Sequence, residues 1–214
     1  MKWLNGYQAK TLNVFPEGKE PFSLIGQFQG LRYEEGVGRT LKVTIMIADT
    51  FGLSQALPIR AGNKVELSFT HPSVKEPFEF TSKKKNELLI ANIASEMGNS
   101  KRHMYILECV TKTTMSNLTT RVIKRYKGKI TDSVEKVLKD VLEVDPSRID
   151  IPHPAMNEYT FTGNYNPPLK QISRLASKCV GEQKGKSSAE SGSAGYVLCE
   201  SERKGYKFFS VDKA

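Results

Sequence analysis

The sequence has few cysteines and no long apolar run, and both shortages exclude classes of protein. Its three cysteines, Cys109, Cys179 and Cys199, include no CxxC pair, so neither a zinc ribbon nor a disulfide framework is predicted and a reducing compartment is expected. No segment approaches the roughly 18 consecutive apolar residues of a membrane span, and the N-terminal sequence MKWLNGYQAK lacks the apolar stretch of a signal peptide. We therefore expect a soluble protein without a signal peptide and without a membrane partner.

Histidine is also scarce, which weakens metal-site and catalytic interpretations. His71, His103 and His153 are isolated, with no HxxxH or HxH spacing, so ordinary loop histidines are favoured over metal ligands. Gly185-Lys186-Ser187 mimics the end of a phosphate-binding loop, but Val180 stands where the first glycine is required. An enzyme whose triad assembles only in space stays open as a third alternative, although no GxSxG elbow supports it. The sequence predicts no catalytic residue, no metal and no cofactor.

Basic residues outnumber acidic ones, which raises the hypothesis of a nucleic acid or an acidic protein as partner. The chain has 32 Lys and Arg against 23 Asp and Glu, a net charge of +9. The excess is shared, because residues 1–115 contain 15 basic and 11 acidic side chains and residues 116–214 contain 17 and 12. Only Lys112–Lys129 is one-sided, with six basic residues and no acidic one.

This one-sided segment supplies the candidate partner interface. Its candidate contact residues are Arg121, Lys124, Arg125, Lys127 and Lys129. An uncompensated basic ridge beside a domain boundary often faces an acidic partner, which favours a protein contact. The alternative is a basic nucleic-acid-binding module in which Tyr126 stacks on a base and affinity falls steeply with salt. The other basic run, Lys83–Lys85, is interpreted as a solvated hairpin turn.

The first half of the chain has the period of two that is typical of half-buried strands. The apolar residues on the predicted core faces are Leu41, Val43, Ile45, Ile47, Val65, Leu67 and Phe69. Residues 22–33 and 40–48 are predicted to form a long hairpin with a tight connection at Gly36 and Gly38. Leu88–Ile93 and Met104–Val110 are apolar on both faces, which predicts cover by a core and by another element or subunit.

After about Thr113 the period changes to that of amphipathic helices. Asp132–Glu135 has the form of a capping box, and apolar residues follow at helical spacing, so a helix is predicted that ends before Pro146. A second helix is predicted with Asn166 as its N-cap and Pro167 at its first position. Residues 181–195, rich in Gly and Ser, are expected to form a flexible loop before a terminal hairpin over 196–211.

These patterns predict an α+β protein with two domains. Residues 1–115 would form an antiparallel β-barrel domain. Residues 116–214 would form a small α/β subdomain with two amphipathic helices, the flexible loop 181–195 and the terminal hairpin. The boundary is expected between Thr113 and Thr131.

The order of these elements resembles the central baseplate hub of contractile-tailed bacteriophages. This T-even-like hub is related in fold to the tail-tube protein and to the type VI secretion spike, and in it a tube-type β-barrel is interrupted by an α/β subdomain. The segments that carry the resemblance are the hairpin over 22–48, Ala61–Phe69, Met104–Thr113, Lys129–Leu138, Thr160–Leu169 and Gly205–Asp212. The resemblance covers most of the chain through the order and character of its elements.

The resemblance implies a structural, non-enzymatic protein of the virion that is assembled in the host cytoplasm. It implies a ring, a homotrimer, that joins the central spike to the tail tube, with the tape measure and neighbouring baseplate proteins as further partners. Direct nucleic-acid binding is not part of such a role. Hubs of this family carry a second tube-type barrel without a counterpart in residues 1–214, which fits either a longer product or a shortened relative.

Overall fold

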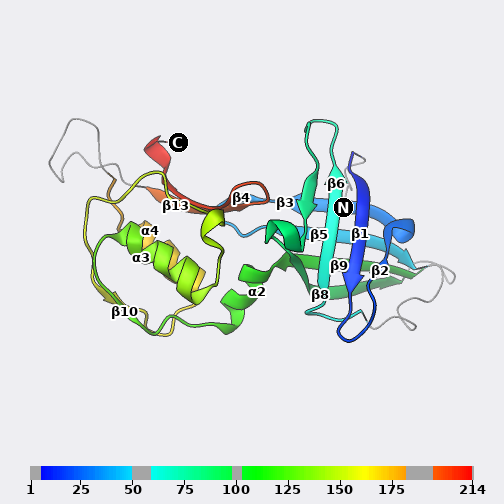
Figure 1. Ribbon diagram of the computed structural model, residues 1–214, viewed down its shortest axis with the longest axis horizontal. Coiled ribbons are helices and arrows are strands. Elements are labelled where there is room, and N and C mark those ends of the chain that lie inside the picture. Colours follow the sequence, from blue (N-terminus) through cyan, green and yellow to red (C-terminus); the bar gives the residue numbers. More distant parts are fainter. Residues whose placement is uncertain (1–5, 50–58, 98–102, 182–194, 214) are drawn as a thin grey trace. The chain divides into compact units, whose positions relative to one another are not determined.

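The computed structural model describes residues 6–49, 59–97, 103–181 and 195–213, in which the chain forms two compact units (Figure 1). The first unit contains Met1–Glu34 and Leu41–Met115, and the second contains Glu35–Thr40 and Ser116–Ala214. The hexapeptide Glu35–Thr40 therefore belongs to the second unit. The predicted division into residues 1–115 and 116–214 placed it in the first. That the units are separate folding domains stays a prediction.

The first unit is built on one eight-stranded antiparallel sheet. The strand order is β2-β1-β6-β8-β9-β5-β3, with β7 paired to β6. The strands are β1 (Gln8–Phe15), β2 (Phe22–Ser23), β3 (Phe28–Glu34), β5 (Lys42–Asp49), β6 (Lys64–Thr70), β7 (Phe78–Phe80), β8 (Leu88–Met97) and β9 (His103–Thr111). Short 3-10 helices lie at Ile25–Gln27 and Ser82–Lys84.

This sheet folds over on itself around the core of the first unit. In Figure 1, β1 and β6 run across the direction of β8, β9 and β5. β6 pairs with β8 only at Lys64↔Leu89 and Val65↔Leu88, so the two layers meet at this corner and diverge from it. Leu12, Leu67 and Leu107 are at most 1% exposed between the layers. Among the described residues the pairing path ends at β2 and β3, so the predicted closed barrel is not shown, whereas the α+β class is confirmed.

The predicted alternation of apolar residues is confirmed in β5 and β6. Val43, Ile45, Val65, Leu67 and Phe69 are all completely buried. Their polar neighbours are only half-buried, which is the pattern of strands with one face on a core. The period of the sequence therefore decided correctly which side chains form this core.

The predicted hairpin is confirmed for β3 and β5, but its first strand begins at Phe28 instead of Phe22, since Phe22–Ser23 pairs with β1, and the predicted tight connection is wrong. The strands pair from Phe28↔Ile47 to Glu34↔Lys42. The residues between them leave this sheet, because Gly36–Val37 forms strand β4 of the second unit and pairs with Cys199 and Glu200. Of the two glycines, only Gly38 has a left-handed backbone, with φ of +70°.

The predicted cover on both faces of β8 and β9 is not confirmed for this chain. Leu88, Ile90 and Leu107 on the inner face are at most 1% exposed, whereas Leu89 and Ile106 on the other face are half-buried. Cover by another subunit stays a prediction. β9 extends one residue beyond Val110 and ends two residues before Thr113, because Lys112–Thr119 forms the helix α2. The sequence did not predict α2, since its threonines are poor helix formers.

The second unit combines helices with short strands. Its four-stranded sheet has the order β11-β14-β13-β4, and β10 pairs separately with β12. The strands are β4 (Gly36–Val37), β10 (Arg125–Tyr126), β11 (Ile149–Asp150), β12 (Phe161–Thr162), β13 (Tyr196–Ser201) and β14 (Gly205–Ser210). The helices are α3 (Ile130–Lys136), which continues as a π-helical turn (Val137–Val141), and α4 (Pro168–Ala176), with 3-10 helices at Pro146–Arg148 and Val211–Lys213.

Both predicted helices exist, although both predicted N-caps are wrong. α3 begins at Ile130 with Lys129 as N-cap, so Asp132 lies inside the first turn, where its carboxylate faces the positive end of the helix. α4 begins at Pro168, one residue later than predicted. Asn166 does not cap it, because its side-chain amide donates to the carbonyl oxygen of Gly163 (3.0 Å) and to Oε1 of Gln171 (3.2 Å).

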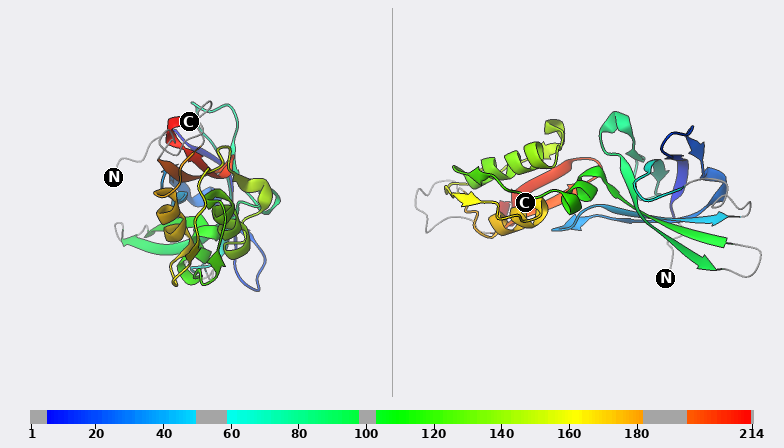
Figure 2. Two further views of the ribbon diagram at one scale, coloured as in Figure 1. Left: turned by 90° about the vertical axis from the view of Figure 1, so that its left-hand side faces the viewer. Right: turned by 90° about the horizontal axis from the view of Figure 1, so that it is seen from below.

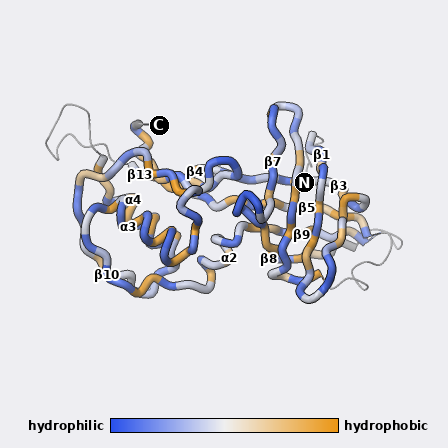
Figure 3. Tube along the Cα trace, in the orientation of Figure 1, coloured by the Kyte–Doolittle hydropathy of each residue, from blue (hydrophilic) through white to orange (hydrophobic). Residues whose placement is uncertain are grey.

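The apolar faces of these helices form the core of the second unit. Orange and blue residues alternate along α3 and α4 in Figure 3, as expected for helices with one buried face. Val134, Val137, Leu138 and Ile172 are completely buried, and Leu175 is 1% exposed. In the right-hand view of Figure 2 these helices lie alongside the strands of their own unit. No helix in the described residues is long and apolar enough to cross a membrane.

The predicted terminal hairpin is confirmed. β13 and β14 pair from Tyr196↔Ser210 to Ser201↔Gly205. Tyr196, Tyr206 and Phe208 are buried in the core of this unit, whereas the side chain of Phe209 points to the other face. The loop predicted over 181–195 lies, except for its two end residues, outside the described residues.

Two of the three cysteines are expected to resist modification in the folded protein. Cys109 and Cys179 are at most 2% exposed, while Cys199 is half-buried. Burial raises the pKa of both buried thiols to about 12, helped at Cys109 by the charge of Glu108. Burial also raises the pKa of the Cys199 thiol, but this thiol is only half-buried. Because alkylation needs an accessible thiolate, we expect alkylation of Cys109 and Cys179 at least ~100-fold slower than that of Cys199. Mass spectrometry after timed alkylation, without and with denaturant, measures this; equal rates in the folded protein would contradict it.

The same raised pKa values give the stability a pH dependence. Protonated thiols are favoured in the folded state, so this contribution is complete below the ordinary thiol pKa of 9.0 and is lost as the pH rises towards about 12. The free energy of unfolding is therefore expected to fall over this alkaline range. Urea denaturation along a pH series measures the fall, and replacing Cys109 or Cys179 with alanine should reduce its size.

Candidate partner interface

The five candidate cations lie on a segment that runs antiparallel to residues 158–166. Arg125 pairs with Thr162 and Tyr126 with Phe161. Isolated bridges extend this contact, joining Val122 to Asn166 and Lys129 to Glu158. The basic segment is thus one strand of an irregular ribbon in the second unit, which we call the basic ribbon (residues 121–129 and 158–166).

Buried side chains at intervals of four hold the basic ribbon on the core. Val122, Tyr126 and Ile130 are 1%, 7% and 0% exposed. The residues between them face solvent, and all of the candidate cations are exposed: Arg121, Lys124, Arg125, Lys127 and Lys129. The structure therefore brings the predicted interface residues together along one short segment.

No ion pair neutralises these cations within the described part of the chain. Arg121 donates from Nη1 to the carbonyl oxygens of Leu118 (2.9 Å) and Thr120 (2.7 Å), which fixes the side chain but leaves its charge. Glu158, opposite Lys129, is exposed and forms no ion pair with it. A row of unpaired cations repels itself, so an acidic partner would find a favourable surface here.

Tyr126 is not available for stacking on a nucleic-acid base, contrary to the alternative that the sequence left open. Its ring is buried and stacks on Phe161, with ring centroids 5.1 Å apart and planes inclined by 10°. Among the described residues its hydroxyl is buried without a hydrogen-bond partner. Burial, and secondarily the charge of Asp140, raises the pKa of this hydroxyl.

The orphan hydroxyl of Tyr126 makes a simple stability prediction. A buried hydroxyl without a partner loses its hydration with nothing in exchange, so Tyr126→Phe is expected to leave the free energy of unfolding unchanged or to raise it by about 1 kcal/mol. Tyr206→Phe is the matched control, since the Tyr206 hydroxyl donates to Oε1 of Glu200 at 2.5 Å in a buried pair. That variant is expected to lose about 1–3 kcal/mol. Urea denaturation of both variants tests the contrast, and a larger loss for Tyr126→Phe would refute it.

Gly163 fixes how closely the two sides of the basic ribbon approach. Its amide donates to the carbonyl oxygen of Lys124 at 3.1 Å. A Cβ atom at this position would lie 2.2 Å from the carbonyl oxygen of Val122 and 2.5 Å from its Cγ1. Only glycine therefore allows this approach. The contact sets the position of the backbone that carries the cations.

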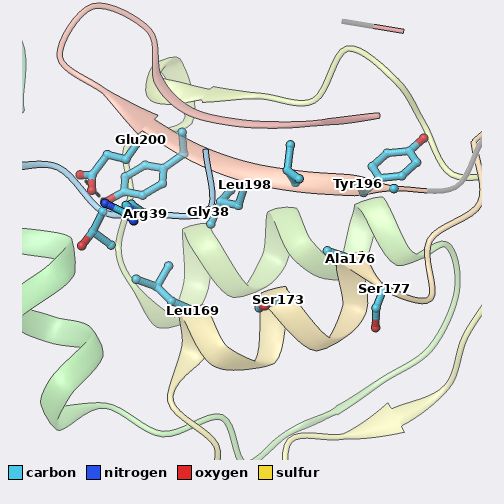
Figure 4. A pocket seen from close by; sticks show the side chains of 13 residues that line it. Gly38, Arg39, Leu169, Ser173, Ala176, Ser177, Tyr196, Leu198 and Glu200 are labelled. Carbon is cyan, nitrogen blue, oxygen red and sulfur yellow. Dashed lines mark hydrogen bonds between the residues drawn. The ribbon is translucent and has the colours of Figure 1, made fainter. Parts of the chain in front are cut away.

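The second unit contains a groove. It measures about 260 Å³ and lies between α4, β13 and residues 38–40 (Figure 4). Leu169, Ala176 and Leu198 give it apolar walls, and Ser173 and Ser177 line it without a histidine or cysteine nearby in the lining. Its lining also contains Tyr206 and Glu200, whose hydroxyl and carboxylate are both buried and hydrogen-bonded to each other.

The described histidines stand in separate surroundings. Nδ1 of His71 accepts from the amide of Ser73 at 3.2 Å inside a turn, and His103 is exposed at the start of β9. The carbonyl oxygen of His153 accepts from the hydroxyl of Tyr196 at 3.1 Å. In residues 6–49, 59–97, 103–181 and 195–213, no group of three or more His, Cys, Asp or Glu side chains is arranged to hold a metal ion.

The sequence patterns missed apolar residues that accompany the cations. Leu118, Ile123 and Tyr165 are 62%, 60% and 76% exposed. Ile123 and Leu118 interrupt a polar, basic segment, and this signal was visible in the sequence. The position of Tyr165 beside them was not, because it depends on the pairing of two distant segments.

No known family model matches the chain, and no curated protein matches it. Solved structures share its fold. The 43 kDa tail protein of prophage MuSo2 from Shewanella oneidensis has a TM-score of 0.57 at 10% identity, over 94% of this chain and 53% of its own. The tail protein of Neisseria meningitidis MC58 has a TM-score of 0.53 at 10% identity, over 95% and 50%.

A third similar structure is the E. coli c3393 protein, a component of the type VI secretion system with structural similarity to the T4 bacteriophage tail proteins gp27 and gp5. Its TM-score is 0.51 at 10% identity, over 95% of this chain and 48% of its own. The chain thus spans about half the length of these solved structures. At the level of the fold, the predicted resemblance to tail and baseplate proteins is confirmed.

Proposed function

We propose that the chain is a structural, non-enzymatic component of a phage tail, in which it acts as a baseplate hub protein. The observation that carries the proposal is the fold shared with two tail proteins and a type VI secretion component over 94–95% of the chain. The location of such a protein is the virion, after assembly in the host cytoplasm.

In this proposal the chain forms a homotrimeric ring that joins the central spike to the tail tube. Among the described residues, β2 and β3 are the edge strands of the first sheet. Edge strands of this kind can become closing contacts when a neighbouring subunit pairs with them. A tube-type barrel would be completed in the assembled ring. The tape measure and neighbouring baseplate proteins would be further partners.

The exposed cations of the basic ribbon would provide one of these contacts. Lys124, Arg125 and Lys127 lie on the same short segment without an acidic partner in the described residues. Charged groups at an interface accelerate association and select the partner with the complementary charge. An acidic surface on a sister subunit or on a baseplate protein would fit them.

Purified tails provide the test of the proposed function. We expect mass spectrometry to detect the chain in tails from the phage or prophage that encodes it, and chemical cross-linking to join copies of it into trimers. Analytical ultracentrifugation of the isolated chain should show weak, concentration-dependent association, because ring contacts lack their partners. Absence from tails, or a compact monomer at all concentrations, would reject the hub role.

A further inference from the structure

Three exposed apolar side chains lie beside the cations of the basic ribbon. Leu118, Ile123 and Tyr165 are each at least 60% exposed. We call these three residues the anchor patch. Exposed apolar residues that stand singly need no explanation, but a group among unpaired charges is typical of a binding surface.

Backbone hydrogen bonds hold Ile123 and Tyr165 in the same part of the ribbon. The amide of Tyr165 donates to the carbonyl oxygen of Val122 at 3.1 Å, and the amide of Gly163 donates to that of Lys124 at 3.1 Å. The carbonyls before and after Ile123 are therefore both bound by the turn that carries Tyr165. Val122 points into the core, so Ile123 points outward.

Leu118, at the end of α2, is tied to the same region. Its carbonyl oxygen accepts from the guanidinium of Arg121 at 2.9 Å. Oδ1 of the preceding Asn117 accepts from the amide of Leu169, at the start of α4, at 2.8 Å. The end of α2 is therefore bonded both to Arg121 of the ribbon and, at the start of α4, to Leu169, which follows Tyr165 by four residues in the chain.

The backbone at Tyr165 is unfavourable for a tyrosine. Asn164 and Tyr165 have φ of +49° and +57°, and the turn closes with a hydrogen bond of 3.1 Å from the amide of Asn166 to the carbonyl oxygen of Gly163. Glycine and asparagine adopt this left-handed conformation readily, whereas a bulky residue is strained. Tyr165 is 76% exposed, so it gains little burial to offset that strain. Strained residues of this kind gather at binding sites.

We propose that the anchor patch and the cations around it form one docking surface for an acidic protein segment. Ile123 and Tyr165 enter apolar depressions on that partner, while Arg121, Lys124 and Arg125 face its carboxylates. The proposal deepens the assembly role and rests on it. Charge complementarity selects the partner, because four cations of the segment have no acid opposite them, and only Lys129 lies across from Glu158.

A protein fits this surface better than a nucleic acid does. Tyrosine and arginine are enriched among the residues that carry binding energy at protein interfaces, and apolar side chains fill their centres. Leu118 and Ile123 gain nothing from a phosphate backbone, and Tyr126, the aromatic residue within the basic segment, is buried. A protein partner can offer carboxylates to the cations and apolar depressions to the anchor patch.

Photo-cross-linking from position 165 identifies what occupies the surface. The full chain with Tyr165→p-benzoylphenylalanine is produced during tail assembly, irradiated, and its adducts are identified by mass spectrometry. We expect adducts on a protein segment rich in Asp and Glu. Val211→p-benzoylphenylalanine, at a residue 51% exposed outside the patch, is the control and should not give this adduct. Adducts on nucleic acid or on a basic segment, or none from chains present in tails, would overturn the proposal.

A paired substitution separates docking from folding. Ile123→Ser with Tyr165→Asn removes the apolar anchors. Asparagine tolerates the left-handed turn, so the temperature of thermal unfolding should not fall. We expect at least ~10-fold less of this variant in tails, and wild-type incorporation of Val211→Ser. Normal incorporation of the paired variant would refute the docking surface. If the wild-type chain is absent from tails, the proposed function fails, while an adduct from position 165 on an acidic protein elsewhere would still support the surface.

Discussion

Replacing Lys124, Arg125 and Lys127 with glutamate is expected to reduce incorporation of the chain into tails by about tenfold or more. All three side chains are exposed on the basic ribbon and form no ion pair among the described residues. Reversing the charge of these side chains would turn attraction to an acidic partner into repulsion, and like charges across an interface are strongly unfavourable. Folding should be preserved, because surface substitutions usually change the free energy of unfolding by less than about 0.5 kcal/mol.

The matched control reverses three exposed lysines of the first unit. Lys19, Lys75 and Lys83 are exposed, and their replacement by glutamate changes the net charge by the same amount. Quantitative mass spectrometry of tails should find this control at wild-type levels. Equal losses in both variants would show that net charge, and not the basic ribbon, controls assembly.

A salt titration against duplex and single-stranded DNA tests the nucleic-acid alternative with the same variant. For an assembly surface, binding of the wild-type chain to DNA should be negligible at physiological salt. A nucleic-acid-binding module would make several phosphate contacts, so its affinity would fall by about 10³-fold or more between low and moderate salt. Tight, salt-sensitive binding that the triple variant loses, together with normal assembly, would reverse the interpretation of this segment.

Gly163→Ala is expected to lower the free energy of unfolding of the second unit by about 3 kcal/mol or more. The added Cβ would lie 2.2 Å from the carbonyl oxygen of Val122, which is backbone and cannot rotate away. Relief requires separation of the ribbon, which breaks the hydrogen bond from Gly163 to the carbonyl oxygen of Lys124. Urea denaturation and amide hydrogen exchange of residues 122–126 measure the loss.

Gly26→Ala is the control for the loss of glycine itself. A Cβ at Gly26 meets no atom within 4 Å, and its backbone is outside the left-handed region. Its replacement is expected to change stability by less than about 1 kcal/mol, in either direction. Similar stabilities of Gly163→Ala and wild type would mean that the close approach at Val122 is not required.

Part of the candidate site could be predicted from the sequence alone. The excess of cations in Lys112–Lys129 was evident from the sequence, and the structure places all five candidate residues on the solvent side. The same segment left base stacking by Tyr126 open as an alternative, because nothing local shows that Phe161, far along the chain, stacks on its ring. Tyr165 was missed for the same reason.

The sequence by itself determined the elements whose character is local. Buried faces were identified from the period of two in β5 and β6 and from the helical spacing in α3. In both cases the geometry of the local backbone fixes which side chains share a face. β1 escaped prediction because its first half, Gln8–Thr11, is polar or weakly apolar. The N-caps were misplaced because capping depends on the path of the preceding chain.

Only the tertiary structure decided which distant segments meet. It assigned Glu35–Thr40 to the second unit through the pairing of β4 with β13, although the flanking strands form a hairpin in the first unit. It also required glycine at position 163, where a side chain would collide with Val122. Such contacts are set by the packing of whole elements, and a one-residue shift in that packing would change every partner without changing the local pattern.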